Sequence, residues 1–407
     1  MQIPSSPANR PLAINANPRR TLLPVFFYFL AAGIATVMLG PLLPALIQRW
    51  HIQDAQAGTL FTASFIGQFC GAWVATRNLR ASILYGSAIT AAGCAAIAWA
   101  AFGIAHIAMF SIGLGLGAGL TAGNVIAGTA IPASRTRLIA ALNVAWGLGA
   151  IACPLLVRLS GIQNFFFVTA AALGVASLLS IIIPRTPQAE FPAVAEITQQ
   201  STATQTSAAH PRMPLPLIPL LFFAIAAFLY VGVENSLGGW LPSYAVRTNP
   251  TLRPSSISLC FWIAELAGRI LVTGLMSLLD EAILYRLCLA LLILTQILLC
   301  TIAHIAAAGV VALTIFAALT LAPLYPLLTS FLLARTGNHP KLGVLFACAS
   351  IGGATLPWLT GVVSTHLGGL RVGLLIPATG AALLLFLSAT ITAPPAKFRH
   401  EKSRSIR

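Results

Sequence analysis

Apolar stretches long enough to cross a lipid bilayer follow one another along almost the whole sequence, separated by short polar turns. The hydrocarbon core of a bilayer is about 30 Å thick, and a helix needs about 20 predominantly apolar residues to cross it. Only 8% of the 407 residues are charged, whereas soluble domains average roughly 25%. The sequence therefore predicts an all-α integral membrane protein and argues against a soluble enzyme.

Twelve transmembrane helices can be placed in the chain, in two sets of six. The first set covers residues 21–46, 56–76, 82–102, 106–131, 137–159 and 164–184, and the second covers 215–245, 255–279, 283–303, 305–333, 341–366 and 371–393. The polar interval between the sets is rich in Pro, Ala, Ser, Thr and Gln, a composition typical of a flexible linker. The predicted organisation is a tail (1–20), a six-helix bundle (21–184), a linker (185–214), a second six-helix bundle (215–393) and a basic tail (394–407).

Positive charges in the loops predict the orientation of the chain, because Lys and Arg are retained on the cytoplasmic side of a membrane. If the N-terminus is inside, 17 of the 23 Lys and Arg residues fall in inside segments and Arg269 lies within a span. The outside segments then hold five, namely Arg49, Arg158, Arg247, Arg253 and Arg371. This bias predicts cytoplasmic termini in the cell inner (plasma) membrane, and it explains the net charge of +15 without nucleic acid.

Motifs for enzymatic or metal chemistry do not stand out. The seven cysteines all fall in apolar stretches and none forms a C-x-x-C pair, so packing is a better explanation than disulfides or zinc. We find neither a Walker A sequence nor an H-E-x-x-H motif. We therefore expect a protein that is not an enzyme, has no cofactor or metal, and draws energy from an ion gradient.

The two halves of the sequence echo each other. The first span ends in Gly40-Pro-Leu-Leu-Pro44 and the seventh in Gly238-Gly-Trp-Leu-Pro242, so both read G-x-x-L-P. Gly71 follows the first motif and Gly268 follows the second at nearly the same spacing. These matches indicate a duplicated unit, a construction common in secondary transporters.

The loop after the second span resembles a motif of the major facilitator superfamily, G-x-x-x-D-R-x-G-R-K. The chain reads GAWVATRNLR from Gly71 to Arg80, with Ala75 in place of the acid. The second half carries a counterpart in Gly268-Arg269 followed by Asp280. The whole chain resembles this superfamily, which implies two pseudo-symmetric bundles that expose a central site alternately to each side. The resemblance implies gating or structural roles for Gly71, Arg77, Arg80, Arg269 and Asp280.

Several segments resemble the fucose–galactose–glucose transporter group within that superfamily. They are TLAPLYPLLTS (320–330), ASIGGATLPWLTGVVS (349–364), GGLRVGLLIPA (368–378) and the stretch from Tyr230 to Tyr244. The resemblance implies a hexose or related sugar moving with a proton or a sodium ion. The fucose members use an acid in the first span and another in the fourth. Here the first span has none and the fourth offers only Asn124, so the ion site must lie elsewhere.

Two carboxylates fall within predicted spans, Glu234 and Glu265. A charge at the bilayer centre costs roughly 3 kcal/mol on insertion scales, so such residues usually face a partner or a wet cavity. Glu234 lies among Gly232, Gly238, Gly239 and Pro242, a pattern that predicts a broken or kinked helix lining a cavity. We expect Glu234 to couple transport to an ion or bind solute; the alternative is a neutral acid bonded to a neighbouring helix.

Glu265 and Arg269 are four residues apart, which places them on one helix face. Mutual neutralisation lowers the cost of burying them. Glu265 is thus a second candidate for ion coupling, and the alternative for both residues is a structural clasp near the cytoplasmic gate.

Solute recognition requires hydrogen-bonding groups and, for sugars, flat apolar faces. The candidate polar residues within spans are Gln68, Asn124, Asn143 and Asn235. The candidate platforms are Trp146, Tyr230, Trp262 and Tyr325, with Trp240 and Trp358 as further aromatic residues. Each of these side chains has packing as its ordinary alternative, and Trp240 and Tyr244 also fit an aromatic belt at the membrane interface.

The pattern as a whole predicts a secondary active transporter that moves a small polar solute, with a hexose as the first candidate. The alternative is a proton-driven exporter of amphipathic drugs or metabolites, because an aromatic cavity serves that task too. The expected partners are the solute, a coupling proton or sodium ion and the lipid bilayer, and we expect the chain to act as a monomer.

Overall fold

The computed structural model describes residues 18–75, 78–131, 134–184, 217–275, 278–302, 304–336 and 342–392. The regular elements of these segments are helices, as a lipid-embedded chain requires because each helix satisfies its own backbone hydrogen bonds. The predicted linker, the predicted C-terminal tail and residues 1–17 of the predicted N-terminal tail lie outside the described residues. The predicted all-α fold class is confirmed.

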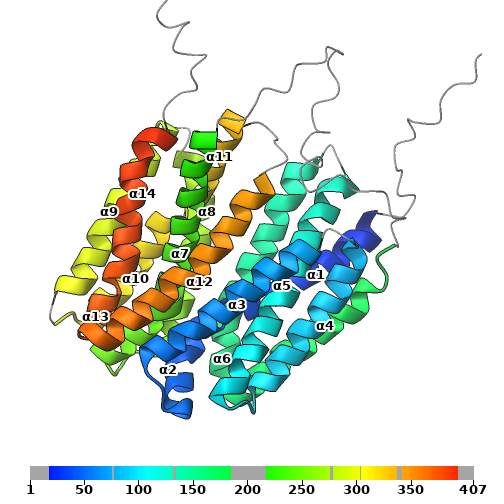
Figure 1. Ribbon diagram of the computed structural model, residues 1–407, viewed down its shortest axis with the longest axis horizontal. Coiled ribbons are helices and arrows are strands. Elements are labelled where there is room, and N and C mark those ends of the chain that lie inside the picture. The colour runs from blue at the N-terminus through cyan, green and yellow to red at the C-terminus, as the bar shows by residue number, and fades with distance from the viewer. Residues whose placement is uncertain are drawn as a thin grey trace, which may run out of the picture.

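The first six helices form one bundle, here called the N-half, and the remaining helices form a second, the C-half (Figure 1). The N-half contains α1 (Pro18–Val37), α2 (Leu39–Trp50), α3 (Asp54–Val74), α4 (Leu79–Ile97), α5 (Phe102–Ala130) and α6 (Arg135–Ser180). The C-half contains α7 (Leu217–Thr248), α8 (Pro254–Leu275), α9 (Glu281–Thr301), α10 (Ala307–Leu321), α11 (Leu324–Thr336), α12 (Leu342–Leu367), α13 (Leu370–Gly373) and α14 (Leu375–Ile391).

Both halves share two ends, which are named here by what they carry. The start of α1 and the end of α14 lie at one end of the molecule, the termini end (Figure 1). The opposite end, the far end, carries α2, the start of α3 and α13. These names refer only to the molecule and carry no assignment to a side of the membrane.

Every predicted span overlaps a described helix. By length and apolar composition, eight described helices are suited to cross a membrane, or nine if the bent pair α1–α2 counts as one span. The fifth and sixth predicted spans are merged in α6, where Gly161 turns the chain with a φ of +74°. The tenth is divided between α10 and α11. The number of twelve crossings therefore stays a prediction.

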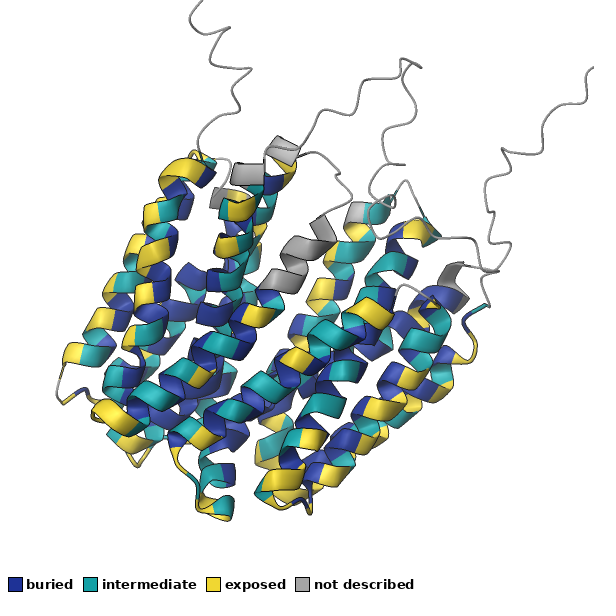
Figure 2. Cartoon of the chain, in the orientation of Figure 1, coloured by how far each residue is buried: buried dark blue, intermediate teal, exposed yellow. Residues whose placement is uncertain are grey.

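Figure 2 shows buried residues toward the inside of the bundles and exposed residues on their outer faces. Leu159 is 82% exposed and Phe386 is 80% exposed, as expected of residues that face lipid. Inside, α3 and α5 approach so closely that a Cβ atom at Gly71 would overlap the carbonyl oxygen of Leu114. On α5 itself, a Cβ atom at Gly113 would overlap the carbonyl oxygen of Ser64 and one at Gly117 that of Gln68, so small residues on both helices allow this close packing.

A break in the seventh span and a belt position for two of its aromatic residues are both wrong. The Gly and Pro residues around Glu234 do not break α7, which is helical from Leu217 to Thr248 with Pro242 inside it. Their small surfaces instead admit neighbouring helices. Trp240 and Tyr244 are not belt residues, because both are fully buried and donate hydrogen bonds to carbonyl oxygens, Trp240 to Pro357 and Tyr244 to Leu299.

Candidate functional site

Two carboxylates and one guanidinium meet between α7 and α8. Arg269 Nη2 donates to Glu265 Oε1 over 2.5 Å and to Glu234 Oε1 over 3.2 Å. The hydroxyl of Tyr230 donates to the same Glu234 oxygen over 2.8 Å. Tyr230 and Glu234 are one helical turn apart on α7, as Glu265 and Arg269 are on α8. These four residues are called the acid–guanidinium cluster below.

Charge in this cluster is unbalanced. With both carboxylates ionised, one guanidinium leaves a net charge of −1 in a site of low exposure. The side chain of Glu265 is 3% exposed, that of Glu234 is 14% exposed and that of Arg269 is 24% exposed. Coulomb interactions are strong where water is excluded, so such a site favours one further positive charge. Glu234 is the more exposed carboxylate and the one farther from Arg269, so it is the better place for that charge.

Aromatic rings from both halves surround the cluster. The ring centroid of Tyr325 lies 5.4 Å from that of Tyr230, so Tyr325 covers the cluster from within the C-half. Trp146 comes from α6 in the N-half, and its ring centroid lies 5.9 Å from the Arg269 guanidinium carbon, within reach of a cation–π interaction. Its indole N–H donates to the Thr36 hydroxyl over 3.4 Å. Trp146 therefore links the cluster to the opposite half.

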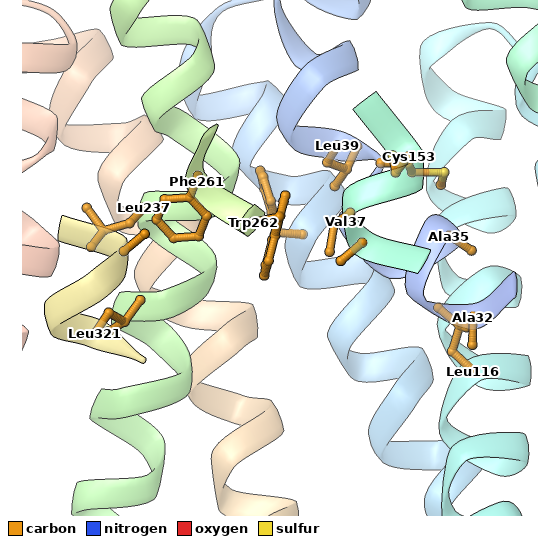
Figure 3. Packing of buried hydrophobic residues seen from close by; sticks show 14 of the residues in the cluster. Ala32, Ala35, Val37, Leu39, Leu116, Cys153, Leu237, Phe261, Trp262 and Leu321 are labelled. Carbon is orange, nitrogen blue, oxygen red and sulfur yellow. The ribbon is translucent and has the colours of Figure 1, made fainter. Parts of the chain in front are cut away.

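Trp262 marks the seam between the halves. Its ring meets Trp146 edge to face at 5.8 Å, and Figure 3 shows it between Leu237 and Phe261 on one side and Val37 and Leu39 on the other. It is 6% exposed, and its indole nitrogen has no hydrogen-bond partner among the described residues.

A small cavity opens at this seam. Trp262 and Asn235 line it from the C-half, and Thr36, Phe61 and Ser64 line it from the N-half. Its free volume of about 20 Å³ has room for a single water molecule. The halves are in close contact beside this cavity, because a Cβ atom at Gly40 would lie 2.5 Å from the carbonyl oxygen of Gly238, and both glycines line it.

The remaining polar candidates lie outside the acid–guanidinium cluster. Asn235 donates its amide to the Val231 carbonyl over 2.8 Å, and Asn143 donates to Ile139 over 3.1 Å on an exposed face of α6, one turn before Trp146. Gln68 on α3 is half-buried. Asn124 on α5 is half-buried too, and its side-chain oxygen has no described partner.

The residues expected to gate or support the fold are dispersed. Arg269 lies in the cluster itself, whereas Gly71 packs α3 against α5. Arg80 is half-buried in the first turn of α4, and Asp280 is the exposed N-cap of α9, where its carboxylate accepts from the backbone N–H of Ala282 over 2.9 Å. Arg77, for which a gating or structural role was expected, lies outside the described residues.

Sequence analysis missed Asp54 and Arg247, which form an ion pair between the halves. Asp54 stands in the first turn of α3, where an acid is ordinarily explained by the helix dipole, so the sequence held no signal of its partner.

The family follows from a match that covers most of the chain. The model of the Major Facilitator Superfamily matches residues 25–341. The chain belongs to the Major Facilitator Superfamily. It is similar to a glucose/galactose transporter of Brucella abortus biovar 1 (strain 9-941), with 28% identity over 176 residues, and that match spans 41% of each chain. The resemblance to sugar transporters seen in the sequence is confirmed.

Solved structures of other transporters share the fold of this chain. It superposes on the inward-open xylose transporter XylE from E. coli with a TM-score of 0.73 and 12% identity, covering 93% of this chain and 97% of that one. It superposes on FucP in the outward conformation with a TM-score of 0.60 and 19% identity, covering 91% and 98%. Membership of the superfamily places this chain in a family of membrane transport proteins.

Proposed function

We propose that this transporter is a proton-coupled hexose symporter of the cell inner membrane, with both termini in the cytoplasm. The observation that carries the proposal is the pair of carboxylates, Glu234 and Glu265, that share the single guanidinium of Arg269. The similarity to a glucose/galactose transporter supports the choice of solute. The excess of Lys and Arg in the predicted inside loops supports the orientation.

Proton binding at Glu234 follows from the charge of the cluster. One proton brings the net charge from −1 to zero while Glu265 and Arg269 remain an ion pair. A neutral cluster crosses between the two open conformations at lower cost, because moving a charge through an apolar site is unfavourable. Tyr230 holds Glu234 in place through its hydroxyl. The proton therefore enters with the solute from one side and leaves to the other.

Solute binding involves the seam between the halves. Trp146 and Trp262 offer flat apolar faces there, and Asn235 offers an amide beside the small cavity. Trp146 belongs to the N-half and Trp262 to the C-half, so a sugar held between the two rings contacts both halves. Binding of solute is thereby linked to the relative position of the halves, as alternating access requires.

The test is uptake by the full-length chain in proteoliposomes with an imposed proton gradient. Labelled glucose and galactose are supplied outside, with and without a sodium gradient of equal size. The proposal expects proton-driven, sodium-independent uptake of at least one of the two sugars. Sodium-driven uptake would contradict proton coupling, and proton-driven exchange of an amphipathic dye without sugar uptake would show an exporter instead.

A further inference from the structure

The far end of the transporter holds a buried carboxylate whose partners come from the opposite half. Asp54 begins α3 in the N-half, and its side chain is 8% exposed. Arg247, in the last turn of α7 in the C-half, donates to both oxygens of this carboxylate, over 2.6 and 2.7 Å. Ser364 on α12 donates its hydroxyl to the same group over 2.5 Å. Three helices from two halves thus meet at one carboxylate.

Neighbouring hydrogen bonds continue this connection along α3 and α12. The backbone N–H of Ala55 donates to the Thr365 hydroxyl over 2.9 Å. Further along α3, the Thr62 hydroxyl donates to the carbonyl oxygen of Ala354 on α12 over 2.8 Å. These bonds hold the first half of α3 against the last half of α12, so the halves are closed at the far end.

The positions of the two charges make the pair reversible. Asp54 lies in the first turn of α3 and Arg247 in the last turn of α7. A negative charge at a helix N-terminus and a positive charge at a C-terminus are each favourable without a partner. The Arg247 side chain is also 41% exposed, so water can solvate it when the pair separates. Separation therefore leaves neither charge without compensation.

Two helix backbones touch beside this pair. A Cβ atom added at Gly361 on α12 would overlap the carbonyl oxygen of Asp54 on α3, so α3 and α12 approach each other closely next to the carboxylate. Further along α3, the rings of Phe61 and Phe65 pack against Gly239 on α7 and Gly353 on α12, so apolar contacts add to the closure. The Asp54–Arg247 pair is the charged link at this end.

We propose that Asp54, Arg247 and Ser364 form a latch that closes the far end of the transport path, and that this end opens only when Arg247 leaves Asp54. The latch lies apart from the acid–guanidinium cluster and acts on the balance between the two conformations. The proposed latch does not depend on which solute or ion the transporter carries, so the experiment that tests it needs no added solute and no ion gradient.

Distance measurement by pulsed electron paramagnetic resonance tests the latch. Spin labels are attached at Gln48→Cys and His366→Cys, two exposed far-end positions in opposite halves, in a full-length chain with its native cysteines replaced and held in lipid nanodiscs. The latched parent gives a dominant short distance. Asp54→Asn and Arg247→Gln each add a longer distance and raise the open-to-closed ratio at least about fivefold, the factor that a lost ion pair of this exposure supports.

Matched variants separate the latch from charge in general. Arg253→Gln removes an exposed positive charge at the same end and leaves the distances unchanged. Arg247→Lys keeps the charge without the two-pronged geometry and gives an intermediate ratio. Size-exclusion profiles check that each variant is folded; if Asp54→Asn is not, Arg247→Gln decides alone. Unchanged distances in the folded latch variants would overturn the proposal, and so would an equal shift in Arg253→Gln.

Discussion

Replacing Glu234 with Gln is the sharpest perturbation of the acid–guanidinium cluster. The amide fixes this position in a neutral form that resembles the protonated acid and cannot exchange a proton. Arg269 loses its partner at 3.2 Å but keeps Glu265 at 2.5 Å. Tyr230 can still donate to the amide oxygen. We therefore expect a stability loss of only about 1 kcal/mol, the size of one weakened hydrogen bond.

Accumulation of solute is where the variant should fail. One pH unit corresponds to a free energy of about 1.4 kcal/mol per proton, or about a tenfold gradient. A symporter that carries one proton per sugar accumulates sugar up to about tenfold across one pH unit. The Gln variant should bring the sugar to equal concentrations and no further. Exchange of labelled for unlabelled sugar without a pH difference should persist, because it needs no net proton movement.

The assay compares the parent, Glu234→Gln and Glu281→Gln in proteoliposomes with an imposed difference of one pH unit. Glu281 is a half-buried acid at the start of α9 that accepts a hydrogen bond from Ser330 over 3.2 Å, so its replacement controls for loss of a carboxylate elsewhere. The control should accumulate sugar like the parent. Tenfold accumulation by Glu234→Gln would refute the role of this residue in coupling.

Three further changes test the energetics of the fold. Arg269→Gln leaves the buried Glu265 and the half-buried Glu234 without their cation and should cost about 3–5 kcal/mol, seen as a far lower melting temperature than for Glu234→Gln; equal melting temperatures would contradict the shared ion pair. Gly71→Leu places a side chain against the Leu114 carbonyl and should abolish the folded monodisperse peak in size-exclusion chromatography, whereas Gly103→Leu, which meets open space, should not. Trp240→Phe removes the hydrogen bond to the Pro357 carbonyl oxygen and should lower the free energy of unfolding by about 1–3 kcal/mol. An unchanged free energy of unfolding would show that this carbonyl oxygen accepts from another donor instead.

The helical architecture could be read from the sequence because lipid leaves few alternatives. A backbone that must satisfy its own hydrogen bonds in an apolar medium forms helices, and hydropathy locates them. The pair Glu265 and Arg269 could also be predicted, because residues four apart share a helix face. The positions of the helices and the pairing of Glu265 with Arg269 both follow from the spacing of nearby residues, which can be read from the sequence.

Contacts between helices could not be read in this way. Glu234 meets Arg269 across 35 residues, and Asp54 meets Arg247 across 193. Burial cost drew attention to Glu234 because it lies inside a span, whereas Asp54 at a helix start had a sufficient local explanation. The glycines of α7 show the same limit, since close packing and helix breaking use the same residues and only the neighbouring helices decide between them.

The most direct measurement is proton movement that follows the sugar. Proteoliposomes with equal pH on both sides, a pH-sensitive dye inside and no sugar inside receive glucose or galactose from outside. The account predicts acidification of the interior with the parent chain, about one proton for each sugar that enters, and none with Glu234→Gln. Sugar entry at the parent rate with no change in internal pH would contradict it.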